Sequence, residues 1–384
     1  MASNANIDTQ LMTAYVIYFI IILPMHLVSM RHLKYLFYVK AVSTPVIGFA
    51  ILGWTVKQVG MGNSDLWNQD TTLKGSALAW TFLNGLYANI GSWSTLAVNV
   101  PDFTRYAKEN RSAFVTLFVL PATGCLITFF GVVMASGSKI LFGSILWDPL
   151  LFIDNWTSRG GRAAAFFCAF FLLISQIGVN IAANSVSAAN DLNCLFPKYI
   201  NIRRGQLIVA FIGSWALTPW NILTSAEGFI NFMSGYAVWL GPLAGILLSD
   251  FYFVHKKKYD VWELYNKNGI YRYNKWGTNW RAFVAFFCGW VPLLPGLINV
   301  LNSNISLNVG MQHLYDLGYF YGLGSAALSY YLLCRFWPAV PTMISNAVYP
   351  DADIIEARNG GVLPDENIDA AMSDGEEVYV SEKK

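Results

Sequence analysis

Charged side chains are scarce in this sequence of 384 residues. Asp, Glu, Lys and Arg together make up 12% of it, about half the share found in ordinary soluble domains. Hydrophobic residues make up 55%, and the mean hydropathy is +0.42. This composition excludes an ordinary soluble domain and predicts a protein of the lipid bilayer. The net charge of +2 gives no reason to expect nucleic acid as a partner.

Motifs of enzymes and metal sites are also missing from the sequence. It has no H-E-x-x-H, no paired-cysteine metal spacing and no glycine-rich phosphate loop after a strand, and its four histidines are scattered. Four of the five cysteines fall in apolar runs and Cys194 falls in a loop, which indicates free thiols rather than a disulfide framework. We therefore expect no enzyme, no bound cofactor and no metal.

Long apolar runs, in contrast, are abundant. A helix needs about 20 apolar residues to cross a hydrocarbon core of about 30 Å. Nine runs meet this length, at residues 11–29, 36–56, 76–98, 113–135, 164–190, 206–223, 229–254, 281–301 and 315–337. Residues 1–10 lack the basic segment of a cleavable signal peptide, so the first run is expected to direct targeting. The predicted fold class is an all-α polytopic membrane protein with its membrane domain at 11–337.

The distribution of Lys and Arg between loops predicts the orientation. One set of loops holds sixteen, whereas the other holds five, which are Lys57, Lys74, Lys139, Arg159 and Arg162. The positive-inside rule places the richer set in the cytosol, residues 1–10 on the exoplasmic side and the C-terminus inside. A run at 140–153, broken by Gly143 and Pro149, is expected to form an interfacial or lid helix.

Residues 338–384 are predicted to be an acidic, disordered cytosolic tail. Residues 347–384 carry ten acidic and three basic side chains and few large apolar groups. Such a segment buries too little surface to offset its ordering entropy. The alternative to a solvated tail is a segment that docks sorting or turnover machinery.

Polar and small residues interrupt the third apolar run. Asn89, Gly91 and Ser92 precede Trp93 there. A helix broken at mid-membrane is tolerated only where its backbone is buried or lines a cavity, and transporters use such breaks to bind polar ligands. One interpretation is therefore a substrate site beside Trp93, whose ring is able to stack on a planar ligand. The alternative is a close helix crossing through small residues, with Trp93 in the core or facing lipid.

The inner end of that run is predicted to form a cytosolic cap. Pro101 suits a first helical position, and Asp102 precedes Arg105 by three residues, which favours an ion pair. Two interpretations stay open: a local helix restart, or a gate element whose ion pair changes between transport states.

A row of amides follows one face of the fifth run. Gln176, Asn180 and Asn184 recur at four-residue spacing. Each unsatisfied polar group in lipid costs several kcal/mol, so the row is expected to face a bundle interior or a wet cavity. The amides either join neighbouring helices or recognise the donor and acceptor edges of a ligand.

The seventh run combines bulky and flexible residues. Phe232, Met233 and Ser234 lie a few residues before Gly241 and Pro242. This arrangement is consistent with a hinged gate and equally with a plain kinked helix.

Three segments resemble nucleobase:cation symporter family 1, in particular its fungal uracil, allantoin and uridine permease branch. They are the run Asn-x-Pro-Asp-Phe-Thr-Arg-Tyr from Asn99, the run Asn-x-Ala-Ala-Asn from Asn180, and Gly241-Pro242 through Ser249-Asp250-Phe251-Tyr252 with Lys257, Lys258 and Tyr259. The resemblance implies a five-plus-five inverted-repeat transporter fold and proton-coupled import of a nucleobase-related molecule at the plasma membrane.

The resemblance also implies roles for individual residues. Trp93, or its neighbours Gly91 and Ser92, would contact the substrate ring, and Asn184 would hydrogen-bond it with Asn180 as support. Phe232 and Met233 would lie at the gate. Sodium-coupled relatives carry hydroxyl residues where this chain has Gly178 and Val179, so the resemblance favours proton over sodium coupling.

Nine runs correspond to the fourth to twelfth helices of the family, so the chain is expected to lack the first three. A different class of function therefore stays open, namely a truncated, non-transporting membrane protein or a gene-model fragment.

Overall fold

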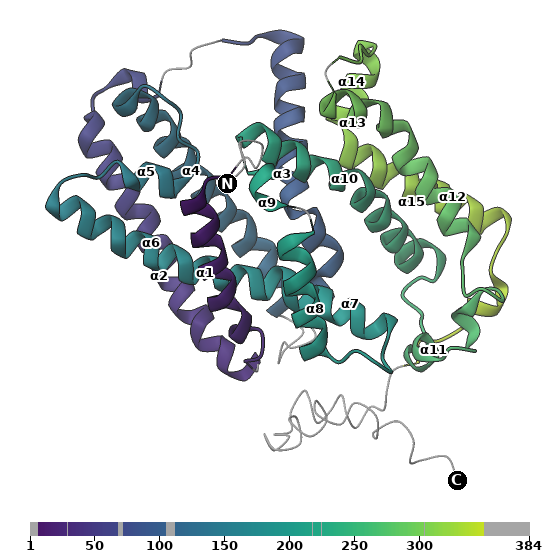
Figure 1. The fold of residues 1–384 in the computed structure, drawn as a ribbon. Helices are drawn as coiled ribbons and strands as arrows, with labels where there is room; N and C mark the ends of the chain where they lie inside the picture. The colour runs from purple at the N-terminus through teal and green to yellow at the C-terminus, as the bar shows by residue number, and fades with distance from the viewer. Residues whose placement is uncertain are drawn as a thin grey trace. The chain divides into compact units, whose positions relative to one another are not determined.

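The computed structural model describes residues 7–28, 30–67, 72–104, 112–216, 218–223, 225–302 and 304–348. These residues form helices, and the one β-bridge among them joins Asp260 to Val348. The helices shown in Figure 1 are α1 (Thr9–Met25), α2 (Met30–Val59), α3 (Gly75–Thr104), α4 (Ser112–Phe142), α5 (Pro149–Asp154), α6 (Arg159–Val179), α7 (Val186–Leu195), α8 (Ile202–Trp215), α9 (Pro219–Ile222), α10 (Ala226–Ser249), α11 (Val261–Tyr265), α12 (Trp280–Trp290), α13 (Leu294–Leu301), α14 (Val309–Asp316) and α15 (Gly318–Phe336). Two π-helices are η2 (Asn180–Ser185) and η3 (Asp250–Val254), and the 3-10 turns are η1 (Ser64–Leu66), η4 (Ile270–Arg272), η5 (Val291–Leu293) and η6 (Val340–Thr342).

The all-α fold class is confirmed, and each of the nine predicted runs overlaps helix, although the run 206–223 is divided between α8 and α9. Five helical stretches in the described part of the chain are long and apolar enough to cross a membrane: His32–Val59, Phe114–Phe142, Arg159–Leu195, Glu227–Val254 and Trp280–Leu301. The runs on α1, α3, α8 and α15 do not meet both criteria, so the count of nine spans stays a prediction.

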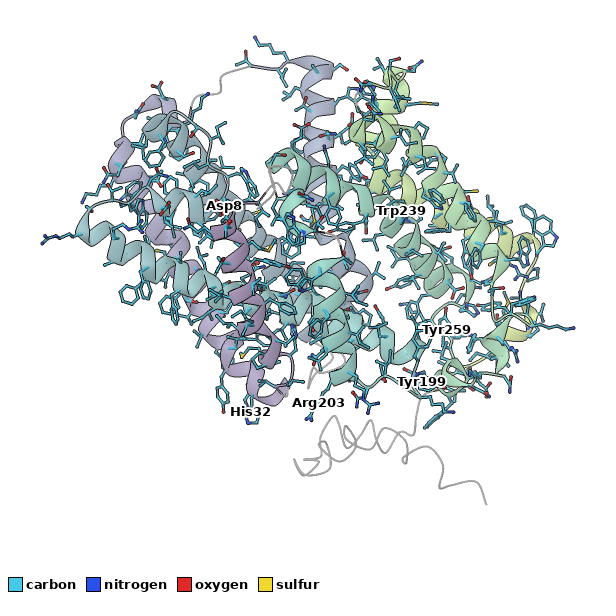
Figure 2. All side chains as sticks on the ribbon, viewed as in Figure 1. Asp8, His32, Tyr199, Arg203, Trp239 and Tyr259 are labelled. Carbon is cyan, nitrogen blue, oxygen red and sulfur yellow. The ribbon has the colours of Figure 1, made fainter. Side chains whose placement is uncertain are left out.

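Several helices begin where a short polar side chain caps the backbone. Asp8 Oδ1 accepts a hydrogen bond from Leu11 N at the start of α1, at 2.7 Å, and Figure 2 labels this residue. Ser158 caps α6 in the same way, and Asn279 caps α12. Each cap satisfies an amide that has no partner inside the helix, a contribution of about 1 kcal/mol.

The first of two compact units comprises Met1–Asn89 and Phe114–Gly235. Within it, α2 packs along α6 and α7 packs along α8. One buried cluster joins α2, α4, α5 and α6 around Ile51, Met134 and Phe152. Another joins α1 and α2 to the interrupted helix α6–η2–α7, and its buried members are Ile22, Leu33, Ile177, Ile181 and Val186.

The second unit comprises Ile90–Ala113 and Tyr236–Lys384. Its α12 packs along α15, and Pro242 of α10 lies against both. A Cβ atom added at Gly289 of α12 would lie 2.6 Å from Pro242 Cγ, and one added at Gly322 of α15 would lie 2.8 Å from Pro242 Cδ. These glycines therefore let three helices approach one another closely, as small residues do between membrane helices.

The predicted interruption of the third run is wrong. Helix α3 is continuous from Gly75 to Thr104, and Pro101 lies inside it rather than at a restart. Within α3, Ser94 Oγ donates to the Gly91 carbonyl oxygen at 2.7 Å. A helical glycine costs about 1 kcal/mol, whereas a backbone group without a partner in lipid costs several, so the helix persists through Gly91.

Two boundaries differ in detail from the sequence-based expectation. The run at 140–153 divides between the end of α4 and the six-residue α5, whose Phe152 is fully buried. The described structure also continues past residue 338, because η6 forms and Val348 N donates to the Tyr259 carbonyl oxygen at 2.9 Å. Residues 349–384 lie outside the described residues, where the disordered tail stays a prediction.

Candidate functional site

A π-helical turn interrupts the span Arg159–Leu195 at the predicted amide row. Residues Asn180–Ser185 form η2, and the Val186 amide donates five residues back to the Ile181 carbonyl. π-Helical turns are rare and occur often at functional sites, because the extra residue per turn widens the backbone locally. The fifth run thus carries a π-turn, which the sequence did not predict, whereas the third run is continuous.

The structure brings the two asparagines of this turn together. Asn184 Nδ2 donates to Asn180 Oδ1 at 2.9 Å. Because each amide has two N–H donors and one oxygen acceptor, Asn180 keeps its NH2 group and Asn184 keeps its oxygen for another partner. Asn184 is exposed on the unit and Asn180 is half-buried. The pair therefore presents a donor and an acceptor side by side.

Side chains of helix α1 and of its C-terminal cap lie next to the π-turn. Ser185 Oγ and His26 Nδ1 lie 3.0 Å apart, and both side chains are 2% exposed. The buried Tyr18 hydroxyl lies beside the Asn180 side chain but makes no hydrogen bond of good geometry to a described residue. The His26–Ser185 contact thus ties η2 to the C-terminal end of α1, and Tyr18 of α1 lies next to the Asn180 amide.

Helix α2 places a lysine next to Gly178. A Cβ atom added at Gly178 would lie 3.1 Å from Lys40 Cδ, so the half-buried Lys40 stem passes directly over this glycine. Thr44 Oγ1 and Ser175 Oγ, 2.9 Å apart, join the same two helices. The Lys40 side chain therefore covers Gly178, one of the two positions at which sodium-coupled relatives carry hydroxyl residues.

The residues predicted at the gate lie in α10. Tyr87 of α3 is 1% exposed, and its hydroxyl donates to the Ser234 carbonyl oxygen at 2.8 Å. Phe232 is 39% exposed. The backbone of α10 is thus fixed at Ser234 by a buried tyrosine, while the neighbouring Phe232 ring is left at the surface of the unit.

The remaining site predictions divide between the units. Asn89 belongs to the first unit together with Asn180 and Asn184, whereas Gly91, Ser92 and the 41% exposed Trp93 belong to the second. A single chamber bounded by all of them stays a prediction. The predicted ion pair at the inner cap lies outside the described residues, which include neither the Asp102 side chain nor Arg105.

A second polar cluster, not predicted from the sequence, lies at the end of α10. Asp250 begins η3, and its carboxylate accepts hydrogen bonds from the hydroxyls of Tyr330, at 2.6 Å, and Tyr259, at 2.5 Å (Figure 2 labels Tyr259). Burial and the neighbouring Asp250 carboxylate raise the pKa of Tyr259, so this phenol stays protonated as a donor.

His255 joins this cluster to the segment that follows α15. Its Nδ1 lies 3.1 Å from Asp250 Oδ1, and its Nε2 lies 3.1 Å from Thr342 Oγ1. Because the Thr342 hydroxyl donates to the Ala339 carbonyl oxygen, it accepts from Nε2. The two contacts hold the His255 ring between η3 and η6.

Sequence reasoning missed Tyr18, His26 and Lys40 as neighbours of the amide row. A polar or ionisable residue in an apolar run is a signal for an interior position. All three carry that signal, but the sequence does not state which helix each one faces.

The sequence of this chain matches a family model and known membrane proteins of yeasts. Residues 2–322 match the family model described as permease for cytosine/purines, uracil, thiamine and allantoin. The chain is 43% identical over 350 residues to an uncharacterized permease of Schizosaccharomyces pombe and 35% identical over 344 residues to the uridine permease of Saccharomyces cerevisiae. The alignments cover 91% and 87% of this chain but 62% and 53% of those relatives, so the chain spans little more than half their length.

The fold is similar to that of a solved transporter. With a TM-score of 0.62 and 20% identity, the chain resembles Mhp1, a nucleobase-cation-symport-1 family transporter, in a closed conformation with bromovinylhydantoin bound. The match covers 90% of this chain and 70% of that one. At this identity the likeness shows the fold alone, which agrees with the predicted transporter architecture.

Proposed function

Because this chain belongs to the family of permeases for cytosine/purines, uracil, thiamine and allantoin, we propose that it carries out secondary active transport of a nucleobase-related small molecule. Uracil, allantoin and uridine are the substrates we propose to test first. The relatives named for such activities are longer than this chain, so transport by these 384 residues alone is part of the proposal.

The observation that carries the proposal is the asparagine pair in the π-turn. Asn180 offers N–H donors next to the Asn184 oxygen. The ring edges of uracil and allantoin each place an N–H beside a carbonyl, which is the complementary pattern. Two neutral hydrogen bonds of about 0.5 to 1.5 kcal/mol each would orient such a ring.

In this proposal Trp93 stacks on the substrate ring, and Asn89, Gly91 and Ser92 border it. Phe232, Met233 and Ser234 close the site, with the Ser234 backbone held by Tyr87. Asp102 and Arg105 act at the inner end as a cap. A planar ring stacked on one face and hydrogen-bonded at its edge is the arrangement that small-molecule sites use for orientation.

We propose import coupled to protons rather than to sodium. Gly178 and Val179 have no side-chain oxygen to coordinate a cation, and the Lys40 stem covers Gly178. A Lys40 ammonium group near this position would repel a second cation, and it is able to release a proton and regain it as the amine. Uptake is therefore expected to fall when external pH is raised from 5 to 8 and to be unchanged when sodium is replaced by choline.

The direct test is uptake of radiolabelled uracil, allantoin and uridine in a permease-deficient host. The wild-type chain is expected to take up at least one of them, and Asn184→Ala to reduce that uptake at low substrate concentration. Asn299→Ala is the matched control, because its amide bonds the Ile305 carbonyl in the other unit. Equal losses in both variants would contradict the proposed role of Asn184.

A second candidate function is a non-transporting membrane protein that acts through assembly; the chain spans 62% and 53% of the two relatives' length. Surface expression without uptake, and uptake restored by fusing the first three helices of a relative, would support this candidate. Uptake by the chain alone would exclude it.

We further propose that the protein resides in the plasma membrane with its C-terminus in the cytosol, where the acidic tail meets sorting or turnover machinery. The sixteen-to-five distribution of Lys and Arg supports this orientation. A C-terminal tag accessible to antibody only after permeabilisation is the expected result, and accessibility in intact cells would contradict it.

A further inference from the structure

A cavity of about 430 Å³ lies at one end of the second unit. Its walls come from residues in 268–274, from Arg281 and from residues in 338–342. The first group includes η4, the second begins α12 and the third includes η6, which follows α15. The cavity thus opens where the predicted span 281–301 starts and the predicted span 315–337 ends, which in the predicted topology is the level of the membrane surface.

The charge of this cavity is positive. Among the residues that line it, Arg272 and Arg281 are charged and none is a carboxylate. Glu263 of α11 is turned to other partners, since its carboxylate accepts from Asn266 Nδ2 and from the Ile270 amide. The N-terminal end of α12, which begins beside Arg281, adds partial positive charge.

Both guanidinium groups keep unused donors. Arg281 Nε donates to the Trp337 carbonyl oxygen, while its Nη1 and Nη2 make no hydrogen bond to any residue in the described ranges. Arg272 spends one N–H on Asn268 Oδ1 and one on the Lys275 carbonyl oxygen, out of five that an arginine carries. The two side chains are thus positioned by the protein and still able to bind an oxyanion.

Two tryptophans near the cavity indicate its level in the membrane. The Arg281 guanidinium lies 5.2 Å from the centroid of the Trp280 ring, and the Trp280 and Trp337 rings meet edge to face at 6.2 Å. Trp280 is 45% exposed and Trp337 is 57% exposed. Exposed tryptophans at helix ends are characteristic of the headgroup level of a bilayer.

We propose that this cavity binds the phosphate of an anionic phospholipid headgroup. Guanidinium groups bind phosphate oxygens through paired N–H donors, and the cavity supplies two of them without a competing carboxylate. The flanking tryptophans lie where the glycerol region of that lipid would be. A choline headgroup would bring its own cation against both arginines, so the site selects anionic lipids. Inorganic phosphate offers the same oxygens without the glycerol region and is expected to bind more weakly.

The test uses the full chain purified in a neutral detergent. It is titrated with dihexanoyl phosphatidic acid, dihexanoyl phosphatidylcholine or inorganic phosphate. Tryptophan fluorescence measures the affinity, and native mass spectrometry counts the ligands bound per chain. One phosphatidic acid per chain is expected, with the other two at least tenfold weaker. Arg272→Gln and Arg281→Gln should each weaken binding about tenfold, the equivalent of about 1.4 kcal/mol for the loss of a charged hydrogen bond. Arg335→Gln in the last turn of α15, outside the cavity lining, should change it less than twofold.

Several results would overturn the proposal. Equal weakening in Arg335→Gln would indicate a diffuse surface effect, and inorganic phosphate binding as tightly as the lipid would assign the cavity to a soluble anion. If neutralising Asp351, Asp353 and Glu356 together raises lipid affinity tenfold, the chain's own tail is the occupant. Arg272→Gln keeps the test valid should Arg281→Gln unfold, because Arg272 is exposed at the end of η4 and does not lie in a long helix. Neither uptake nor substrate binding enters this experiment, so its outcome is independent of the transport proposal.

Discussion

Replacing Gly322 by Ala should destabilise the second unit, whereas the same change at Gly324 should not. Both glycines lie in α15, but a Cβ atom at Gly322 would sit 2.8 Å from Pro242 Cδ, whereas one at Gly324 meets nothing within 4 Å. Each substitution gains up to about 1 kcal/mol of helix propensity. Overpacking a tight contact costs about 1 to 3 kcal/mol, and this cost falls on Gly322→Ala alone.

The assay is thermal unfolding of the two purified variants in the same detergent, compared with wild type. Gly324→Ala should unfold at or above the wild-type temperature, and Gly322→Ala should lie below Gly324→Ala by the equivalent of about 1 to 3 kcal/mol. Pro242 has a rigid ring and lies inside α10, so it has little freedom to move aside. Identical unfolding of the two variants would refute the close packing of α10, α12 and α15.

Three further predictions follow from the polar contacts. His255→Ala should destabilise the second unit by about 2 to 3 kcal/mol and increase proteolysis after residue 338, because it removes the contacts to Asp250 and Thr342; unchanged protease resistance would count against the pairing. Burial raises the pKa of Tyr273 to about 12, so its neutral form stabilises the fold fully below pH 10, its ordinary value, and that stability is lost as pH rises through 12; Tyr273→Phe should flatten the loss between pH 10 and 12, and an unaltered profile would disprove it. Lys40→Gln should remove the pH dependence of uptake while substrate affinity stays within about threefold, and a pH profile like that of wild type would exclude Lys40 from coupling.

The positions of the helices could be predicted from the sequence, because a long apolar run is a strong indication of a membrane helix. Every predicted run overlaps helix, and Asn180 and Asn184 lie on one face, as their spacing indicated. The π-helical form of that turn was beyond the sequence, since nothing in Asn180–Ser185 distinguishes it from an α-helix by composition. The turn packs against the C-terminal end of α1, where His26 meets Ser185, and this tertiary contact is not visible in the sequence.

The wrong prediction at Gly91 has a general physical cause. Glycine propensity is a small term measured in water, where an open backbone can bind solvent. Inside a membrane the intrahelical hydrogen bonds are the main partners a backbone has, so α3 continues past both Gly91 and Pro101. The contact between Lys40 and Gly178 was missed for another reason, because it joins helices far apart in the chain and depends on their packing.

Equilibrium binding to the purified chain tests most directly whether the asparagine pair in the π-turn recognises a substrate ring. Radiolabelled uracil, allantoin and uridine are measured against wild type, Asn184→Ala and the control Asn299→Ala. We predict that the ligand bound by wild type loses about five- to tenfold in affinity in Asn184→Ala, since one neutral hydrogen bond contributes about 1 kcal/mol, and that the control is unchanged. The same affinity in all three proteins would contradict the account.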